Sequence, residues 1–591
     1  MARRSTAARS DSLASTLQPG RGCGGRRPGC EDALQGNLIR SALAALVSTS
    51  RLIPAVAISA LLAALLLAAC GGSSSGEDKG GGTLRVAYNS FPEYLDPALS
   101  YSIEGWTATY DTYIPLLTYA HADGAAGARV IPGLAKSLPK ISDGGRTYTL
   151  TLRRGLRYSD GTPVRASDFV HTLERVFRLN SPGSPFYASI VGAEEFAEKK
   201  RNDIPGVRTD DATGRITIHL VQPRGTFANE LASPIVALVP PQTPVEDMTA
   251  KPPPGTGPYE ITASRPGRSI EYARNPYWAS NNAALLPQIP DGHVDRIEVD
   301  VIRNASTEVD DVERGRYDLM QNPPPADRIA GVREEYAGSQ FEESTQLNTY
   351  YFWMNTTEPP FDDLAVRQAV NYAIDPRALE RIYAGQLKAT HQILPKGMPG
   401  YEEFDLYPHD MKKAKQMIAA ADPAERKVTV WAIETSPNKE AGEYYAGVLD
   451  ELGFETTLKV VSADNYFVVV GNRSTRDRDT GWADWFIDYP HPNDYFQAQL
   501  SGASIAPTNN ANFAEIDEPK LNREIDRLAR EQLGPKQEAE YAQLDREFME
   551  LAPWAPYGAL TLSTFVAADV DLEAMTISPI FGQDFATVQF K

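Results

Sequence analysis

Cysteine is scarce in this sequence of 591 residues, which contains only Cys23, Cys30 and Cys70. Histidine is also rare, with seven residues, and no HExxH sequence occurs. These shortages argue against a cysteine-based metal site, a disulfide framework and a zinc-protease site. A GxxxxGK[ST] phosphate-binding loop is missing as well, which argues against an ATPase.

Basic residues are outnumbered, since 58 Lys and Arg stand against 77 Asp and Glu, for a formal net charge of −19. Nucleic-acid binding requires Lys and Arg to neutralise phosphates, so this class is not indicated. Two enzyme-like patterns, GxGxxG at 20–25 and GxSxG at 72–76, lie in a leader and a polar tether. Neither has the strand and helix around it that the chemistry requires, and both are chance matches.

One long apolar run, from Leu52 to Ala69, follows Arg51 and ends just before Cys70. Such a run is typical of a secretory signal, although 18 apolar residues also approach the length of a membrane span. The sequence Leu67-Ala68-Ala69-Cys70 resembles a lipobox, in which the Cys sulfur is acylated after cleavage before it. We therefore expect a leader and signal peptide over 1–69, a lipidated tether over 70–82 and attachment to the extracytoplasmic face of the membrane.

The chain after residue 82 mixes strand and helix signals, which predicts an α/β fold. Alternating apolar residues predict strands, Asp160-Gly161 predicts a tight turn, and Ser167 is a candidate N-cap. Asp375-Pro376 predicts a cap followed by a helix start. The strands predicted in this way are 84–88, 147–152, 215–220 and 297–301. The aromatic segment 349–354 is expected to be a buried strand or a crossing between domains, and a last helix is expected from about Gln537 to Leu551.

Short motifs in a fixed order resemble the solute-binding proteins of ABC importers in the oligopeptide, dipeptide and nickel group, family 5. The resemblance covers nearly all of the chain after the lipobox. The motifs are LDP at 95–97, LRRGL at 152–156, SDGTPV at 159–164, ASDF at 166–169, GTGPY at 255–259, RNPYW at 274–278, VRQA at 366–369 and YAID at 372–375.

This resemblance implies a two-lobed fold of the periplasmic-binding-protein-like type II, with a hinge between the lobes and an extra domain in the first. The implied protein is a monomer without cofactor that encloses its ligand and docks on an ABC permease. The domains expected on this basis are lobe I over 83–122 and 255–346, its inserted domain over 123–254, lobe II over 347–552, and a C-terminal return to lobe I over 553–591.

The segment GWADWFIDYPHPNDYF, residues 481–496, carries the predicted site. It is similar to a cleft motif of the peptide-binding members, in which an Asp binds the ligand ammonium. Trp485, Asp488 and Tyr489 match that motif, whereas His491 replaces its second Asp. A weaker alignment would use Trp482 and Asp484.

Two aromatic residues of the start of lobe II, Tyr351 and Trp353, complete the predicted ligand-binding set of Asp488, Trp485, Tyr489, Tyr351, Trp353 and His491. A carboxylate suits an ammonium, and aromatic rings supply apolar walls and cation–π contacts. The expected ligand is a small peptide. A sugar or metal chelate, a role in signalling, and more remotely a secreted hydrolase remain open alternatives.

Overall fold

The computed structural model describes residues 81–591, and these residues form one compact unit. The predicted leader, most of the tether and the lipidation site at Cys70 lie outside the described residues. In the described part, no helix has both the length and the apolar character needed to cross a membrane.

Within residues 81–591, twelve strands pair into one continuous sheet that runs through the molecule. Its main path has the order β16-β15-β17-β13-β18-β11-β1-β10-β9-β8, and β12 and β14 pair with β18. The bounds are β16 Glu455–Val461, β15 Lys427–Ile433, β17 Thr480–Phe486, β13 Asn348–Met354, β18 Trp554–Val566, β11 Leu319–Met320, β1 Thr83–Tyr88, β10 Arg296–Val301, β9 Ser269–Arg274, β8 Tyr259–Arg265, β12 Phe341–Thr345 and β14 Leu387–Ala389.

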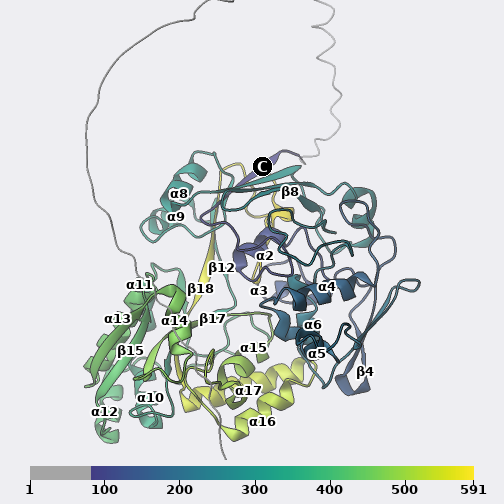
Figure 1. Cartoon of the computed structure of the whole chain (residues 1–591). Helices are drawn as coiled ribbons and strands as arrows, with labels where there is room; N and C mark the ends of the chain where they lie inside the picture. The colour runs from purple at the N-terminus through teal and green to yellow at the C-terminus, as the bar shows by residue number, and fades with distance from the viewer. Residues whose placement is uncertain (1–80) are drawn as a thin grey trace, which may run out of the picture. The chain divides into compact units, whose positions relative to one another are not determined.

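Strand β18 connects the two halves of this sheet (Figure 1). Its first residues pair with β13, where Trp554 lies opposite Trp353. Its last residues pair with β12 and β11, where Phe565 lies opposite Phe341 and Met320. The chain also passes between the halves over the short step from β12 to β13. Lobe I therefore carries the β8–β11 side of the sheet and lobe II the β13–β17 side, and few backbone segments join them.

Helices cover both halves, and the two longest, α13 (Asn438–Glu451) and α17 (Pro535–Leu551), lie in lobe II (Figure 1). The strand predictions at 84–88, 147–152, 215–220, 297–301 and 349–354 are confirmed within one residue or so at each end by β1, β5, β7, β10 and β13. The main helices are α2 Ile103–Thr109, α4 Asp168–Arg178, α8 Ala305–Glu313, α9 Ile329–Tyr336, α10 Leu364–Ala373, α11 Pro376–Ile382, α12 Met411–Ala421, α13 Asn438–Glu451, α14 Ala463–Val470, α16 Pro519–Leu528 and α17 Pro535–Leu551.

The sequence predicted two helix caps and one tight turn in this part of the chain. The cap at Asp375 and the turn at Gly161 are confirmed, and the cap at Ser167 is wrong. The Asp375 side chain accepts the backbone N–H of Arg377 and begins α11. Gly161 has a φ of 86°, as the turn at Asp160-Gly161 requires. Ser167 precedes α4, but its hydroxyl donates to Asp211 at 2.9 Å instead of capping the helix. The competing carboxylate, 44 residues away in the sequence, explains the wrong prediction.

A separate four-stranded sheet lies in the segment predicted as the inserted domain, with the order β4-β5-β7-β6. Its strands are β4 Lys140–Ser142, β5 Thr147–Thr151, β7 Arg215–His219 and β6 Val207–Asp210. Arg175 of α4 joins this region to the LDP motif through a fully buried, two-pronged ion pair with Asp96, at 2.7 and 3.1 Å. The two charges hold the inserted segment against the loop that follows β1.

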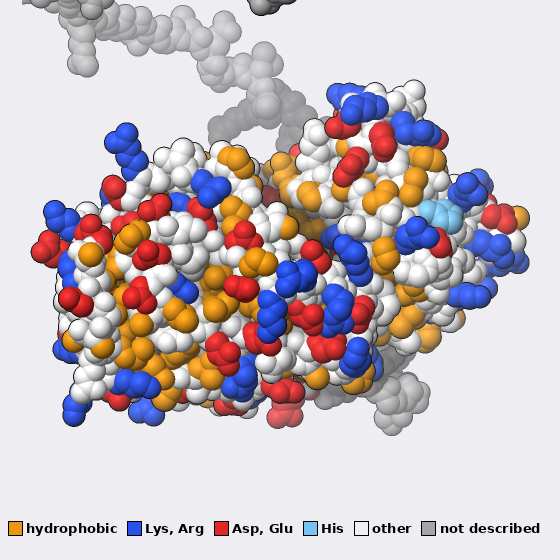
Figure 2. All heavy atoms as spheres, turned by 90° about the horizontal axis from the view of Figure 1, so that it is seen from below, with side chains coloured by type: hydrophobic (Ala, Val, Ile, Leu, Met, Phe, Trp, Pro, Cys, Tyr) orange, Lys and Arg blue, Asp and Glu red, His pale blue; other side chains and the backbone are white. Residues whose placement is uncertain are grey.

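The acidic excess is not gathered on the face drawn in Figure 2, where Lys and Arg lie among Asp and Glu. Many surface charges of the described residues form exposed pairs, such as Lys415 with Glu451 at 2.7 Å. A mixed surface of this kind gives solubility and does not indicate a polyanion-binding stripe.

Candidate ligand-binding site between the lobes

A cavity of about 490 Å³ lies between α2 of lobe I and the β17 side of lobe II. In Figure 1, α2 lies above β17 and the short helix α15, Asn493–Tyr495. We call this hollow the cleft cavity. Its lining comprises Tyr101, Ile103, Trp106, Phe467, Val468, Asp484, Trp485, Phe486, Ile487, Asp488, Gln499, Asn509, Asn510, Ala511 and Phe513.

Asp488 reaches this cavity because β17 ends at Phe486 and two prolines follow shortly afterwards. Pro490 and Pro492 lack the N–H that a continued ladder would need, so the chain leaves the sheet there. The Asp494 side chain stabilises the resulting loop. Its Oδ2 accepts the backbone N–H of Asp488 at 3.1 Å and the indole N–H of Trp485 at 2.9 Å.

The opposite lobe contacts Asp488 directly. The Tyr101 hydroxyl, just before α2, donates to Asp488 Oδ1 at 2.5 Å. The Tyr101 ring packs edge-on against Trp106, with 5.8 Å between the ring centroids. The hydrogen bond between Tyr101 and Asp488 joins residues 387 positions apart and exists only while the lobes are together. The described conformation is therefore closed at Asp488.

Burial raises the pKa of Asp488 to about 6, although the hydrogen bond from Tyr101 lowers it in part. Burial also raises the pKa of Asp494 well above its usual value, and the negative charge of Asp488 raises it further. The two carboxyl groups repel one another when both are ionised. Burial and this repulsion both disfavour the charged form of Asp494, whereas Asp488, with its pKa of about 6, is mostly ionised near neutral pH.

A second carboxyl group, Asp484, lines the same cavity from β17. Burial raises its pKa to about 7, and a hydrogen bond with the Tyr350 side chain lowers it in part. The cavity thus has two acidic groups among mainly aromatic and aliphatic walls. Such walls keep water from screening a charge, so each carboxylate interacts strongly with a cation that enters.

Comparison with known proteins shows one family throughout. Residues 129–507 match the model of the bacterial extracellular solute-binding proteins, family 5, middle part. The chain is 24% identical over 531 residues to the probable di/tripeptide-binding protein 5 of Pseudomonas aeruginosa, which covers 86% of this chain and 96% of that protein.

The chain belongs to the bacterial extracellular solute-binding proteins of family 5.

Other relatives of this family 5 protein differ in the ligands for which they are named. Heme-binding protein A of Haemophilus influenzae is 28% identical over 455 residues, covering 72% of this chain and 78% of that one. The solved structure of the clavulanic acid biosynthesis oligopeptide binding protein 2 aligns with a TM-score of 0.79 at 25% identity, covering 87% and 96% of the two chains. The predicted family and the two-lobed fold are confirmed, and these relatives are named as binding proteins, not as enzymes.

Three of the six predicted site residues lie at hollows between the lobes. Asp488 and Trp485 line the cleft cavity. Tyr489 lines a neighbouring hollow of about 390 Å³, the side cavity, and packs edge-on against Phe186 of the inserted segment at 5.8 Å. Asp488 borders both cavities.

Tyr351 and Trp353 are not brought to the cavity, because both faces of β13 are covered. They share one face, as predicted, but lie one layer behind the wall. The Tyr351 hydroxyl donates to Gln499 at 2.8 Å, and the Trp353 ring packs against Phe513 with 6.2 Å between centroids. Both partners line the cavity, so these two residues support its wall instead of lining it.

His491 is also fully buried and is absent from the lining of both cavities. Burial lowers its pKa to about 3, so the ring is neutral. Its Nδ1 accepts the backbone N–H of Asn493 at 3.1 Å, and its ring lies edge-on to Tyr541. His491 therefore supports the turn that follows Pro490 and borders neither cavity.

Sequence reasoning missed Tyr101, Phe467 and Phe513, and considered Asp484 only as an alternative to Asp488. The structure shows that Asp484 and Asp488 both line the cavity, so the two alignments of the motif point to the same site. Trp482, the partner of Asp484 in the weaker alignment, is buried in the core, and its carbonyl accepts the Tyr466 hydroxyl at 2.5 Å. No sequence motif indicated Tyr101 or the loop that carries Phe513.

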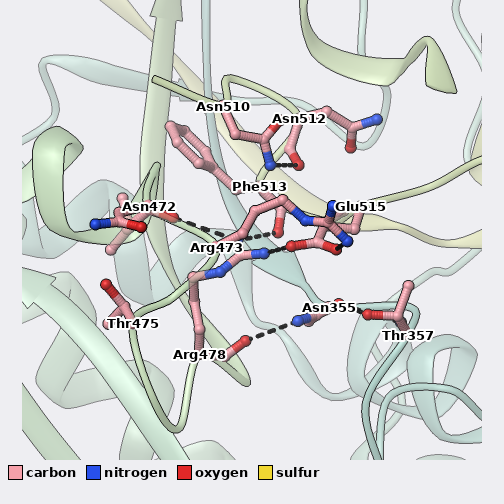
Figure 3. Close-up of polar contacts among 12 residues, drawn as sticks. Asn355, Thr357, Asn472, Arg473, Thr475, Arg478, Asn510, Asn512, Phe513 and Glu515 are labelled. Atoms are coloured by element: carbon pink, nitrogen blue, oxygen red, sulfur yellow. Dashed lines mark hydrogen bonds and ion pairs between the residues drawn. The ribbon is translucent and has the colours of Figure 1, made fainter. Parts of the chain in front are cut away.

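A polar cluster lies behind Phe513 (Figure 3). Arg478 is buried, forms an ion pair with Glu515 and donates to the Phe513 carbonyl at 2.9 Å. Arg473 contacts the other Glu515 oxygen at 2.8 Å. Asn510 donates to the Asn512 carbonyl at 2.9 Å within the same loop. These contacts hold the loop 509–515 in place as one wall of the cleft cavity.

Proposed function

We propose that this family 5 protein is an extracytoplasmic lipoprotein that captures a small peptide between its lobes and delivers it to an ABC permease. The observation that carries the proposal is the position of the Asp488 carboxyl group, which lines an aromatic cavity and accepts a hydrogen bond from Tyr101 of the opposite lobe. An ammonium group placed there would pair with a poorly screened carboxylate at charge-assisted strength.

The backbone beside the cavity also suits a peptide. All of β17 pairs with β13 along one edge, whereas β15 pairs with its other edge only at Thr480 and Gly481. The residues 483–486 thus have a strand edge available beside the cavity that Asp484, Trp485 and Phe486 line. An extended peptide can add to such an edge through main-chain hydrogen bonds.

Closure supplies the coupling between binding and transport. A ligand that touches Asp488 of lobe II and α2 of lobe I makes its full set of contacts only in the closed form. Binding would therefore shift the lobes toward closure, and the closed shape is what a permease would recognise. The relatives named as di/tripeptide-binding and oligopeptide-binding proteins support this class of ligand.

The direct test is native mass spectrometry of freshly purified residues 71–591, followed by calorimetric titration with a peptide panel. We expect a co-purified peptide, and we expect Asp488→Asn to weaken peptide binding by about 10–100-fold, since a hydrogen bond to a charged group contributes roughly 1.5–3 kcal/mol. Asp422→Asn makes the same chemical change at an exposed site in lobe II and should bind as the wild type does.

A bound sugar or metal chelate, with no affinity for any peptide, would refute the peptide ligand while leaving the receptor role intact. Unchanged peptide affinity in Asp488→Asn would refute the role of Asp488. Turnover of a model ester or peptide that persists through stringent purification would favour the hydrolase alternative instead.

A further inference from the structure

The charges around the cleft cavity are all of one sign. Asp484 and Asp488 line it, and none of the described residues in its lining is Lys, Arg or His. A peptide with a free N-terminus brings an ammonium, for which these acids are suited. A short peptide with a free C-terminus also brings a carboxylate, for which this lining provides no cation.

Four arginines around the two cavities are already paired or lie in the side cavity. Arg473 and Arg478 share Glu515, and Arg478 also donates to the Phe513 carbonyl (Figure 3). Arg224 forms a 2.6 Å ion pair with the buried Glu230 in the side cavity, where Arg530 also lies. None of these four guanidinium groups lines the cleft cavity.

The mouth of the cleft cavity is apolar. Phe467 and Val468 of α14 line it while keeping 42% and 60% of their surface exposed. The Phe467 ring stacks on Phe513 with 6.0 Å between centroids. Exposed apolar groups continuous with a pocket wall are typical of surfaces that a ligand covers. The wall and mouth together favour apolar groups on the ligand beyond its ammonium.

We infer that the cleft cavity selects ligands that combine an ammonium with apolar groups and carry no carboxylate near that ammonium. The inference rests on the proposed function and narrows its ligand. An extended chain advances about 3.3–3.6 Å per residue, so the carboxylate of a dipeptide would lie roughly 7 Å from its ammonium. It would be desolvated beside Asp484 without a partner, which is costly. Amidated short peptides, or longer peptides whose carboxylate lies outside, avoid this cost.

The test compares Leu-Leu amide with Leu-Leu by calorimetric titration on residues 71–591 at pH 7. The two probes share the ammonium and both side chains and differ only in the terminal charge. We expect the amide to bind at least tenfold more tightly. N-acetyl-Leu-Leu amide, which lacks the ammonium, should bind at least tenfold more weakly than Leu-Leu amide.

Asp484→Asn removes one of the two acidic groups of the cavity. It should therefore reduce the ratio of the affinity for Leu-Leu amide to the affinity for Leu-Leu by severalfold, whereas Asp422→Asn should leave this ratio unchanged. Leu-Leu that binds as tightly as its amide, or more tightly, would overturn the inference while supporting peptide capture. If Arg530→Gln then abolished the binding of Leu-Leu, the carboxylate would lie in the side cavity. If neither free-amine probe bound, this inference would be wrong, and peptide capture itself would also be wrong if no peptide of the panel bound.

Discussion

Acidification should release an amine-bearing ligand from this protein, and the pKa of Asp488 determines where this occurs. Burial places that pKa at about 6. The carboxyl group is then about nine-tenths ionised at pH 7 and about one-tenth ionised at pH 5. An α-amino group, with a pKa of about 7.7–8.0, remains mostly protonated over this range and contributes little to the change.

If binding requires ionised Asp488, affinity should fall by roughly tenfold between pH 7 and pH 5, approaching a tenfold loss per pH unit below the pKa. The sign follows from the linkage, because the ligand binds the deprotonated carboxyl group and protons compete with it. Asp484, with a pKa of about 7, would steepen the upper part of the curve if it also contacts the ammonium.

The measurement is calorimetric titration of Leu-Leu amide at pH 5, 6 and 7 at constant ionic strength, because salt screens the charge pair. Asp488→Asn should bind weakly and with little pH dependence, and its thermal unfolding at each pH serves as the control for folding. Affinity constant within twofold from pH 5 to pH 7 would refute the reasoning. If the dependence of affinity on pH persisted in Asp488→Asn and disappeared in Asp484→Asn, the ammonium would bind Asp484 and not Asp488.

Three further predictions concern stability and anchoring. Arg175→Met should destabilise the protein by about 3–5 kcal/mol in urea unfolding, because it leaves the Asp96 carboxylate buried without its partner, and Asp96→Asn in the same chain should restore part of the loss. Glu308 of α8 is buried with neither carboxyl oxygen hydrogen-bonded within the described residues, and burial raises its pKa to about 8. Its contribution to stability should therefore fall as pH rises from about 4.5 to 8. The free energy of unfolding of Glu308→Gln should accordingly rise by about 2–4 kcal/mol relative to that of the wild type between pH 5 and pH 8. A difference between the two proteins that does not change with pH would contradict this. Cys70→Ser in the full chain should abolish incorporation of labelled fatty acid and release the protein from the membrane fraction, and unchanged labelling would rule out Cys70 as the acylated residue.

The predicted site residues that line neither cavity are placed there for a common reason. Strand alternation placed Tyr351 and Trp353 on one face of β13, which the structure confirms, but it could not show that other elements cover that face. Whether a strand face borders a cavity depends on what packs against it, and those elements are distant in sequence. His491 was similarly judged from its place in a motif, although its burial depends on Tyr541 of α17.

The sequence by itself determined the family, the strand segments, the turn at Gly161 and the cap at Asp375, because each depends on nearby residues or on motifs in a fixed order. It also directed attention to Asp488. Only the tertiary structure decided that Tyr101, 387 residues away, meets Asp488 across the lobes. It also decided that Asp484 faces the same cavity and that the neighbouring guanidinium groups are paired elsewhere. Cavity charge depends on which distant side chains fold around the same space, and a local pattern does not contain that information.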